Sequence, residues 1–252
     1  MLSTLYYLTR ALAGGVLKHV TRPRADRPDA SRYSTLDEPL EVPVQVAAYE
    51  LVRDRYVEPG DTILDVGFGL GYGFRILGTV QDVRVSGVEV DVSAVERAND
   101  VFKTRPGIGE IVPYDGRTIP FADASFDVVT CVDVLEHIPD YNQFLRELLR
   151  VSRRLVFVST PNRRPEHTNW DGTPKNHWHL REWSSKELRE ILDRVPSRGV
   201  VWHFLDGPWD GPFVVATRPS RKTMALSPLL VSPNAGADVV ARLLSRTRAE
   251  SS

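Results

Sequence analysis

The feature that most constrains this chain is a glycine-rich turn that directly follows a short apolar run. The run Thr62 to Val66 contains β-branched residues and leads into Gly67-Phe68-Gly69-Leu70-Gly71, with a helix expected from near Phe74. Spaced glycines let the backbone pass close under a ligand, and a helix N-terminus offers free N–H groups to an anion. A strand, a glycine turn and a helix in this order therefore predict a nucleotide-type ligand at the end of a parallel strand.

The spacing of the glycines separates the candidate ligands. A dinucleotide fingerprint needs a glycine three residues after its second one, but Tyr72 and Phe74 stand at the two possible positions. A Walker-type phosphate loop is excluded because no Gly-Lys-Ser/Thr follows. Asp65, expected at the mouth of the loop, would repel a pyrophosphate and attract an ammonium group. S-adenosylmethionine (SAM) carries an ammonium, a sulfonium and a carboxylate, so it suits this combination.

Short apolar runs recur along the chain, with helical patterns between most of them. Strands that alternate with helices imply a doubly wound α/β sheet. We expect a mostly parallel, seven-stranded sheet with helices on both faces. The expected strands are 62–66, 83–90, 111–112, 126–132, 154–159, 200–205 and 213–217.

Three segments carry a resemblance to a known family. The pattern Asp65-x-Gly67-x-Gly69-x-Gly71 resembles the first motif of class I SAM-dependent methyltransferases, which have a Rossmann-like fold. The stretch 129–140, Val-Thr-Cys-Val-Asp-Val-Leu-Glu-His-Ile-Pro-Asp, resembles ubiquinone-biosynthesis O-methyltransferases of the methyltransferase type 11 domain. The resemblance covers residues 44–219 at the level of the fold. It departs from the family before the fifth strand, where Val-Ser-Arg-Arg at 151–154 replaces the usual Pro-Gly-Gly turn.

This resemblance implies a SAM site at the carboxyl ends of the strands. Glu89, about twenty residues after the glycines, would accept the two ribose hydroxyls. Asp115 would take the adenine amino group, although an aspartate before glycine is also a common turn former. The residues expected to contact or line the cofactor are Asp65, Gly67, Gly69, Gly71, Glu89, Val90, Asp115, Gly116, Val132 and Asp133.

His137 is the candidate catalytic residue. Methyl transfer from a sulfonium needs mainly positioning and desolvation, but an oxygen nucleophile must still lose a proton. A histidine has an unperturbed pKa near neutrality and suits this general-base role. The alternative, weighed equally, is that His137 caps or packs beneath the helix that opens after Pro139.

The segment 164–183 is rich in histidine and tryptophan and resembles the substrate-covering segment of the class. Its aromatic residues could stack on a ring, a sugar or a lipid headgroup. It could equally be a packed loop before a helix begun by Ser184 or Ser185, with Glu187 as a capping-box partner. His177 and His179, with Glu136 or His167, could suggest a metal site, but they match no known zinc spacing, so no metal ligand set is expected.

Composition restricts compartment and partners. A formal net charge of -1 gives no overall field that favours nucleic acid, and the single cysteine fits a reducing, cytoplasmic compartment. We expect three parts: an amphipathic helix and irregular arm over 1–43, the methyltransferase domain over 44–219, and a partly disordered tail over 220–252. The N-terminal helix packs on its own domain or, as a minority interpretation, makes peripheral contact with a membrane.

The leading hypothesis is methylation of a small-molecule acceptor, at a hydroxyl oxygen, with SAM as cofactor. Two alternatives stay open. One is methylation of a lipid-linked or cell-envelope glycan, and the other is a SAM-binding protein without catalysis. Resemblance at the level of the fold does not choose among these.

Overall fold

The computed structural model describes residues 43–195, 201–206 and 212–217. The expected N-terminal amphipathic helix and arm, up to residue 42, lie outside the described residues, as does the expected tail from 220. Apart from Pro43, the described residues all belong to the expected methyltransferase domain, 44–219.

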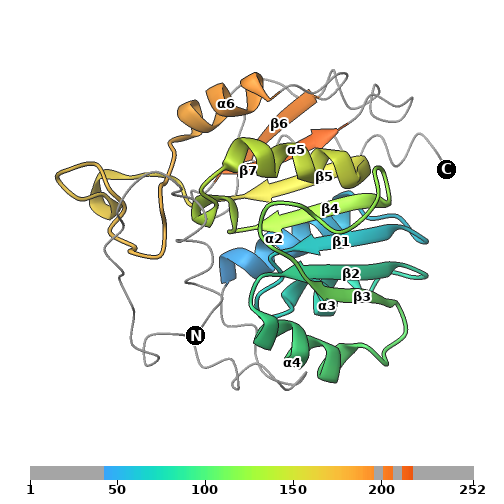
Figure 1. Ribbon diagram of the computed structural model, residues 1–252. Coiled ribbons are helices and arrows are strands. Elements are labelled where there is room, and N and C mark those ends of the chain that lie inside the picture. The colour runs from blue at the N-terminus through green and yellow to red at the C-terminus, as the bar shows by residue number, and fades with distance from the viewer. Residues whose placement is uncertain (1–42, 196–200, 207–211, 218–252) are drawn as a thin grey trace.

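A single seven-stranded sheet forms the centre of the described protein, in the order β3-β2-β1-β4-β5-β7-β6 (Figure 1). Neighbouring strands from β3 to β5 pair in parallel, whereas β7 is antiparallel to both β5 and β6. The expected α/β fold with a mostly parallel seven-stranded sheet is therefore confirmed. The strands are β1 (Thr62–Val66), β2 (Arg84–Glu89), β3 (Ile108–Pro113), β4 (Phe126–Val132), β5 (Ser152–Ser159), β6 (Val201–Asp206) and β7 (Pro212–Thr217).

Helices cover both faces of the sheet, because successive strand residues point to opposite sides. Ile63 belongs to one core and Leu64 to the other, and Val128 and Val129 divide in the same way. The first core includes residues of α2 (Pro43–Arg55), α3 (Tyr72–Leu77) and α4 (Val92–Phe102). The second includes residues of α5 (Tyr141–Val151) and α6 (Ser185–Arg194). Apolar runs without alternation are thus explained by burial on both faces.

Side-chain caps fix where three helices begin. Asp91 accepts a hydrogen bond from the backbone N–H of Ser93 at the start of α4, the capping role that its position indicates. Asp140 does the same for α5 through Gln143. Ser184 forms a capping box with Glu187 at α6, as the sequence predicts.

The junction between α5 and β5 is as short as the sequence suggests, since the helix ends at Val151 and the strand begins at Ser152. Arg153, in this junction, lies 2.5 Å from Asp127. Asp127 also accepts hydrogen bonds from the backbone N–H and the hydroxyl of Thr62, at 2.9 and 2.7 Å. These contacts tie together the starts of β1, β4 and β5, at the edge of the sheet opposite the glycine turn.

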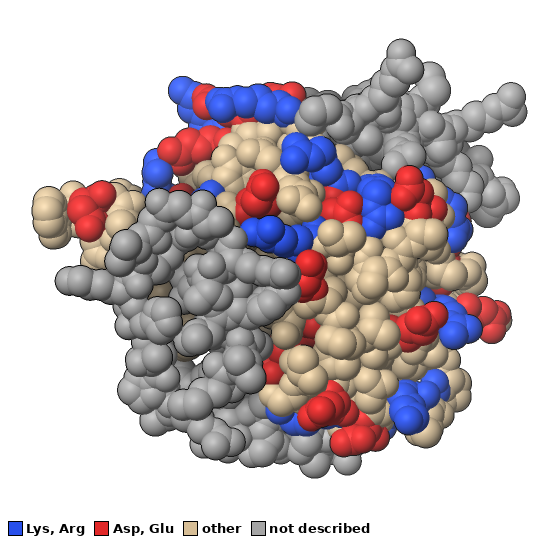
Figure 2. All heavy atoms as spheres, viewed as in Figure 1, with Lys and Arg blue, Asp and Glu red and all other residues tan. Residues whose placement is uncertain are grey.

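The surface of the described residues mixes both signs of charge. Figure 2 shows basic and acidic side chains interspersed with uncharged ones on the face in view. No described helix has the length and apolar character needed to cross a bilayer.

Candidate functional site

The glycine turn lies between β1 and α3, and each of its glycines has a left-handed backbone. The φ angles of Gly67, Gly69 and Gly71 are 72°, 49° and 76°. A Cβ atom on Gly67 would lie 2.6 Å from a methyl group of Val134, and one on Gly71 would lie 2.9 Å from the ring of Phe102. A Cβ atom on Gly69, by contrast, would have as its nearest neighbour the backbone oxygen of Gly67, 3.9 Å away. Gly67 and Gly71 therefore pack the turn against the protein, whereas Gly69 leaves its outer side open to a ligand.

Asp65 does not lie at the mouth of the loop, and here the structure corrects the expected electrostatic role. Its side chain is fully buried and accepts hydrogen bonds from the hydroxyls of Tyr49, at 3.0 Å, and Thr130, at 2.9 Å. Burial raises the pKa of Asp65 to about 7. The carboxylate also lies so close to Gly73 that a Cβ there would be 2.1 Å from its oxygen. Asp65 thus joins α2, β4 and α3 beneath the turn.

Glu89 ends β2 and contacts the glycine turn directly. One carboxylate oxygen accepts the backbone N–H of Gly69 at 3.0 Å, and the other accepts that of Val90 at 2.6 Å. Burial raises the pKa of this carboxyl, while the backbone donors lower it. The structure therefore places Glu89 and Val90 beside the open glycine of the turn, at the carboxyl end of the neighbouring strand.

Asp115 forms the turn after β3. Its Oδ1 accepts the backbone N–H groups of Arg117 and Thr118 at 2.9 and 2.8 Å, so the turn-forming alternative is confirmed. The next residue, Gly116, has a φ of 73° and is buried. Contact of Asp115 with an adenine amino group remains a prediction, and it would fall to the other carboxylate oxygen.

The end of β4 is held in an unusual backbone conformation. Val132 is buried, and Asp133 has a φ of 52°, a left-handed value that costs about 1–2 kcal/mol for a residue with a side chain. Ser159 holds this conformation, since its hydroxyl donates to Asp133 at 2.7 Å and accepts the Asp133 N–H at 3.1 Å. Strain of this kind concentrates at functional sites, because the surrounding structure must maintain it. It directs the chain from β4 into the short helix η3 (Leu135–His137).

His137 is held by a segment that lies far from it in the sequence. Its Nδ1 lies 2.8 Å from the backbone oxygen of Trp178, and a carbonyl can only accept, so Nδ1 carries the proton. Burial lowers the pKa of His137, which keeps the ring neutral at pH 7. The remaining nitrogen, Nε2, therefore has a free lone pair, and it lies 3.8 Å from Glu136. The His137 side chain is 39% exposed, so it is not fully packed beneath the helix that follows Pro139, and its general-base role stays a prediction.

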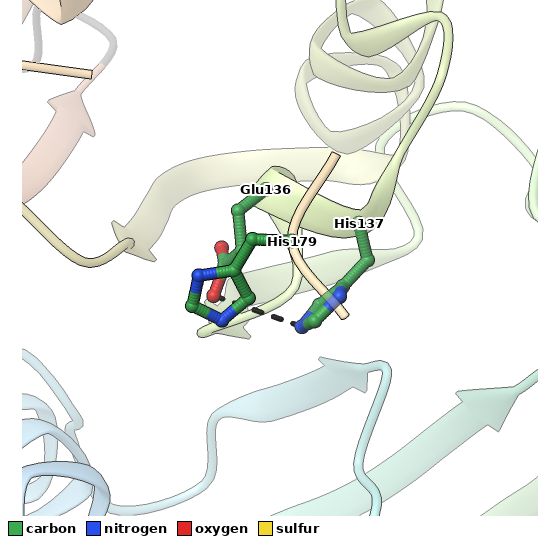
Figure 3. Close-up of side chains that lie close together, drawn as sticks. All are labelled: Glu136, His137 and His179. Atoms are coloured by element: carbon green, nitrogen blue, oxygen red, sulfur yellow. Dashed lines mark ion pairs between the residues drawn. The ribbon is translucent and has the colours of Figure 1, made fainter. Parts of the chain in front are cut away.

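Glu136 and His179 lie beside His137 and point toward it (Figure 3). Glu136 is 1% exposed, accepts a hydrogen bond from Thr160 at 3.0 Å, and has its pKa raised to about 8, mainly by burial. The rings of His137 and His179 meet edge to face at 5.1 Å. The sequence suggests His179 with Glu136 only as a minor metal-binding alternative and does not add His137, because His179 is separated from the other two along the chain.

The segment 164–183 leaves this end of the sheet and returns to contact η3, since Leu180 donates its N–H to the Glu136 carbonyl, and the helix η4 (Pro165–His167) lies near its start. Trp183 is buried against Tyr141, whereas Trp170 is 99% exposed. Two arginines are held by neighbouring side chains: Arg163 pairs with Glu187 at 2.7 Å, and the Arg181 guanidinium lies 4.9 Å from the centre of the Tyr141 ring. The segment therefore combines the packed-loop alternative with aromatic side chains that stay exposed.

Comparisons with known proteins agree with this arrangement. Residues 64–157 match a family described as a methyltransferase domain. A 2-methyl-6-phytyl-1,4-hydroquinone methyltransferase of Synechocystis is 33% identical over 54% of this chain and 40% of its own length. A probable S-adenosylmethionine-dependent methyltransferase of Mycobacterium tuberculosis is 36% identical over 52% of this chain and 46% of its own. The chain thus spans less than half the length of these relatives.

Two further likenesses concern a named acceptor and the fold. A 27-O-demethylrifamycin SV methyltransferase of Amycolatopsis mediterranei is 38% identical over 37% of this chain and 35% of its own length. The crystal structure of a SAM-dependent methyltransferase from Aquifex aeolicus superimposes with a TM-score of 0.59 at 19% identity, covering 77% of this chain and all of that one.

The family, the relatives and the fold agree on SAM as the cofactor of this domain, and the likeness to ubiquinone-biosynthesis enzymes is a minor part of that broader agreement. Residues 64–157 match the methyltransferase-domain family, and the fold of the described residues is that of a solved SAM-dependent methyltransferase.

Proposed function

We propose that this protein transfers the methyl group of SAM to a hydroxyl oxygen of a small-molecule acceptor. The observation that carries the proposal is the convergence, at one edge of the sheet, of the open glycine turn, the Glu89 carboxylate and the free lone pair of His137. Relatives named as a hydroquinone and a rifamycin methyltransferase support an acceptor of this kind.

The residues present fit the cofactor. Gly69 is open on its outer side. Glu89 reaches the same point with Oε2, which accepts only the Gly69 N–H and retains acceptor capacity for a ribose hydroxyl, whereas Oε1 already accepts the N–H groups of Val90 and Asp91. Gly67, Gly71 and buried Asp65 hold the turn in shape beneath it. Val90, Asp115, Gly116, Val132 and Asp133 complete the proposed lining at the ends of β2, β3 and β4.

His137 has the geometry that a general base requires. SAM supplies a methyl group on a sulfonium, and the acceptor oxygen forms its bond to that carbon as the carbon–sulfur bond breaks, with the electron pair passing to sulfur. The Trp178 carbonyl fixes the His137 ring with Nε2 unprotonated, so Nε2 can receive the proton of the hydroxyl.

Calorimetric titration with S-adenosylhomocysteine, the expected product, tests the cofactor site. We expect binding by the wild type and at least about 10-fold weaker binding by Glu89→Ala, since hydrogen bonds to a charged group contribute about 1.5–3 kcal/mol. Glu96→Ala is a matched control, because Glu96 is exposed on α4. Absence of binding by the wild type would overturn the proposal.

Turnover is measured separately as S-adenosylhomocysteine formed from SAM with a panel of hydroquinones, macrocyclic phenols and glycosides. Release that depends on a hydroxyl acceptor is expected. Tight binding of S-adenosylhomocysteine without turnover on any acceptor would instead favour a SAM-binding protein without catalysis.

A further inference from the structure

Three metal-ligating side chains converge beside the proposed acceptor site. Glu136 and His137 come from η3, and His179 comes from the segment that covers it (Figure 3). One ligand atom from each of the three lies within 4.8 Å of the other two. Two imidazoles and one carboxylate form a ligand set that zinc and similar divalent transition metals prefer.

Both histidines have the orientation that metal ligands have. A ligating imidazole usually donates its other ring N–H to a carboxylate or a backbone carbonyl. His137 does this through Nδ1 to the carbonyl of Trp178 at 2.8 Å, and His179 through Nδ1 to Glu182 at 2.6 Å. In each ring Nε2 is the nitrogen left to bind a metal ion.

The surroundings of the three side chains contain a buried carboxylate group with an unused acceptor. Glu182 is buried, and its second carboxylate oxygen, Oε2, has no hydrogen-bond partner among the described residues. A buried carboxylate oxygen without a partner is costly, and Glu136 and Asp133 add further acidic groups in the same region. A divalent cation bound beside Glu182 would stabilise its buried carboxylate.

We propose that Glu136, His137 and His179 bind one divalent transition-metal ion, with Zn²⁺ as the reference ion. Ligand atoms about 2.1 Å from a tetrahedral ion lie about 3.4 Å apart, so both the 3.8 Å between Glu136 and His137 and the wider separations within the set, up to 4.8 Å, must contract when the ion binds. His179 Nε2 lies 2.9 Å from the side-chain amide of Asn176, which must rotate away when the ion binds. A water or acceptor hydroxyl takes the fourth position.

The metal site rests on the proposed methyl transfer to a hydroxyl, and it replaces the general-base role of His137 with a role as metal ligand. A hydroxyl bound to the ion loses its proton to water more readily than a free one, as metal-bound water does. His137 would then act as a ligand through the same Nε2 lone pair that would otherwise receive the proton.

Direct binding of Zn²⁺ to the full chain tests this site independently of activity. The protein is first stripped of metal with a chelator and titrated calorimetrically. We expect one strong site, with affinity at least about 10-fold weaker in His137→Ala, His179→Ala and Glu136→Gln. Glu182→Gln removes only the orienting carboxylate and should weaken binding by about 10–100-fold. His177→Ala is the matched control, because His177 is an exposed histidine of the same segment.

Each variant is also titrated with S-adenosylhomocysteine, and its circular dichroism is compared with that of the wild type. Retained S-adenosylhomocysteine binding shows that a variant is folded. Absence of a strong Zn²⁺ site in the wild type, or an equal loss in His177→Ala, would overturn the metal site. The methyltransferase proposal fails separately, through loss of S-adenosylhomocysteine binding by the wild type.

Discussion

Asp65 makes the free energy of unfolding depend on pH in a direction opposite to that of an ordinary salt-bridged aspartate. The buried carboxyl has its pKa raised to about 7 from 3.8, so the folded protein keeps a proton that the unfolded chain has already released. Stability from this group is greatest below pH 4 and falls as the pH rises toward 7, because the unfolded state then binds fewer protons than the folded state. Above about pH 7 both states are ionised and the contribution is constant.

The magnitude follows from the two pKa values. Between about pH 5 and pH 8 the linkage removes about 2.5 kcal/mol of stability, and the full shift corresponds to about 4 kcal/mol. Asp65→Asn cannot ionise, yet its carbonyl oxygen can still accept from Tyr49 and Thr130. Relative to the wild type, this variant should therefore gain about 2.5 kcal/mol between about pH 5 and pH 8.

Urea denaturation of both proteins at several values between about pH 5 and pH 8 measures the difference. Other buried carboxyls such as Glu89 titrate in both proteins, so their contributions cancel. A difference between wild type and variant that stays constant within about 0.5 kcal/mol over this range would refute the assigned environment of Asp65.

Three other substitutions have defined expectations. Gly67→Ala should destabilise the protein by about 2–4 kcal/mol in urea denaturation, because φ at this position is 72° and the new Cβ would contact Val134. Adding Val134→Ala to this variant should restore part of the lost stability, and no restoration would contradict the contact. Ser184→Ala removes the capping box of α6 and should cost about 1 kcal/mol, visible as a lower Tm, whereas an unchanged Tm would show that the cap is dispensable. His137→Gln should lower kcat about 10²–10⁴-fold with little effect on S-adenosylhomocysteine affinity, and an unchanged kcat would remove His137 from the chemistry.

Much of the fold could be predicted because its signals are local. The strand Thr62–Val66 is predicted with its observed bounds, and β3 is predicted too short, as 111–112, because its half-exposed residues weaken the apolar run. The helix α3 begins at Tyr72, earlier than the expected start near Phe74, since the glycine turn feeds directly into it. Such boundaries depend on packing that short-range patterns do not record.

The residues of the candidate site likewise fall into those that sequence spacing predicts and those that it does not. Glu89 could be placed by counting from the glycines, because parallel strands bring their carboxyl ends to one edge. Tyr49, Thr130 and Ser159 could not be found in this way, since each acts through a hydroxyl brought from a different element.

The sequence by itself determined the order of strands and helices, the glycine turn between strand and helix, and the capping box of Ser184 and Glu187, because backbone sterics and residue periodicity act over a few neighbouring positions. Only the tertiary structure decided that Asp65 faces the interior and that His179 lies beside Glu136 and His137. Those outcomes depend on which distant segments pack together, and burial and hydrogen-bond partners set the charge and orientation of each side chain only after packing is complete.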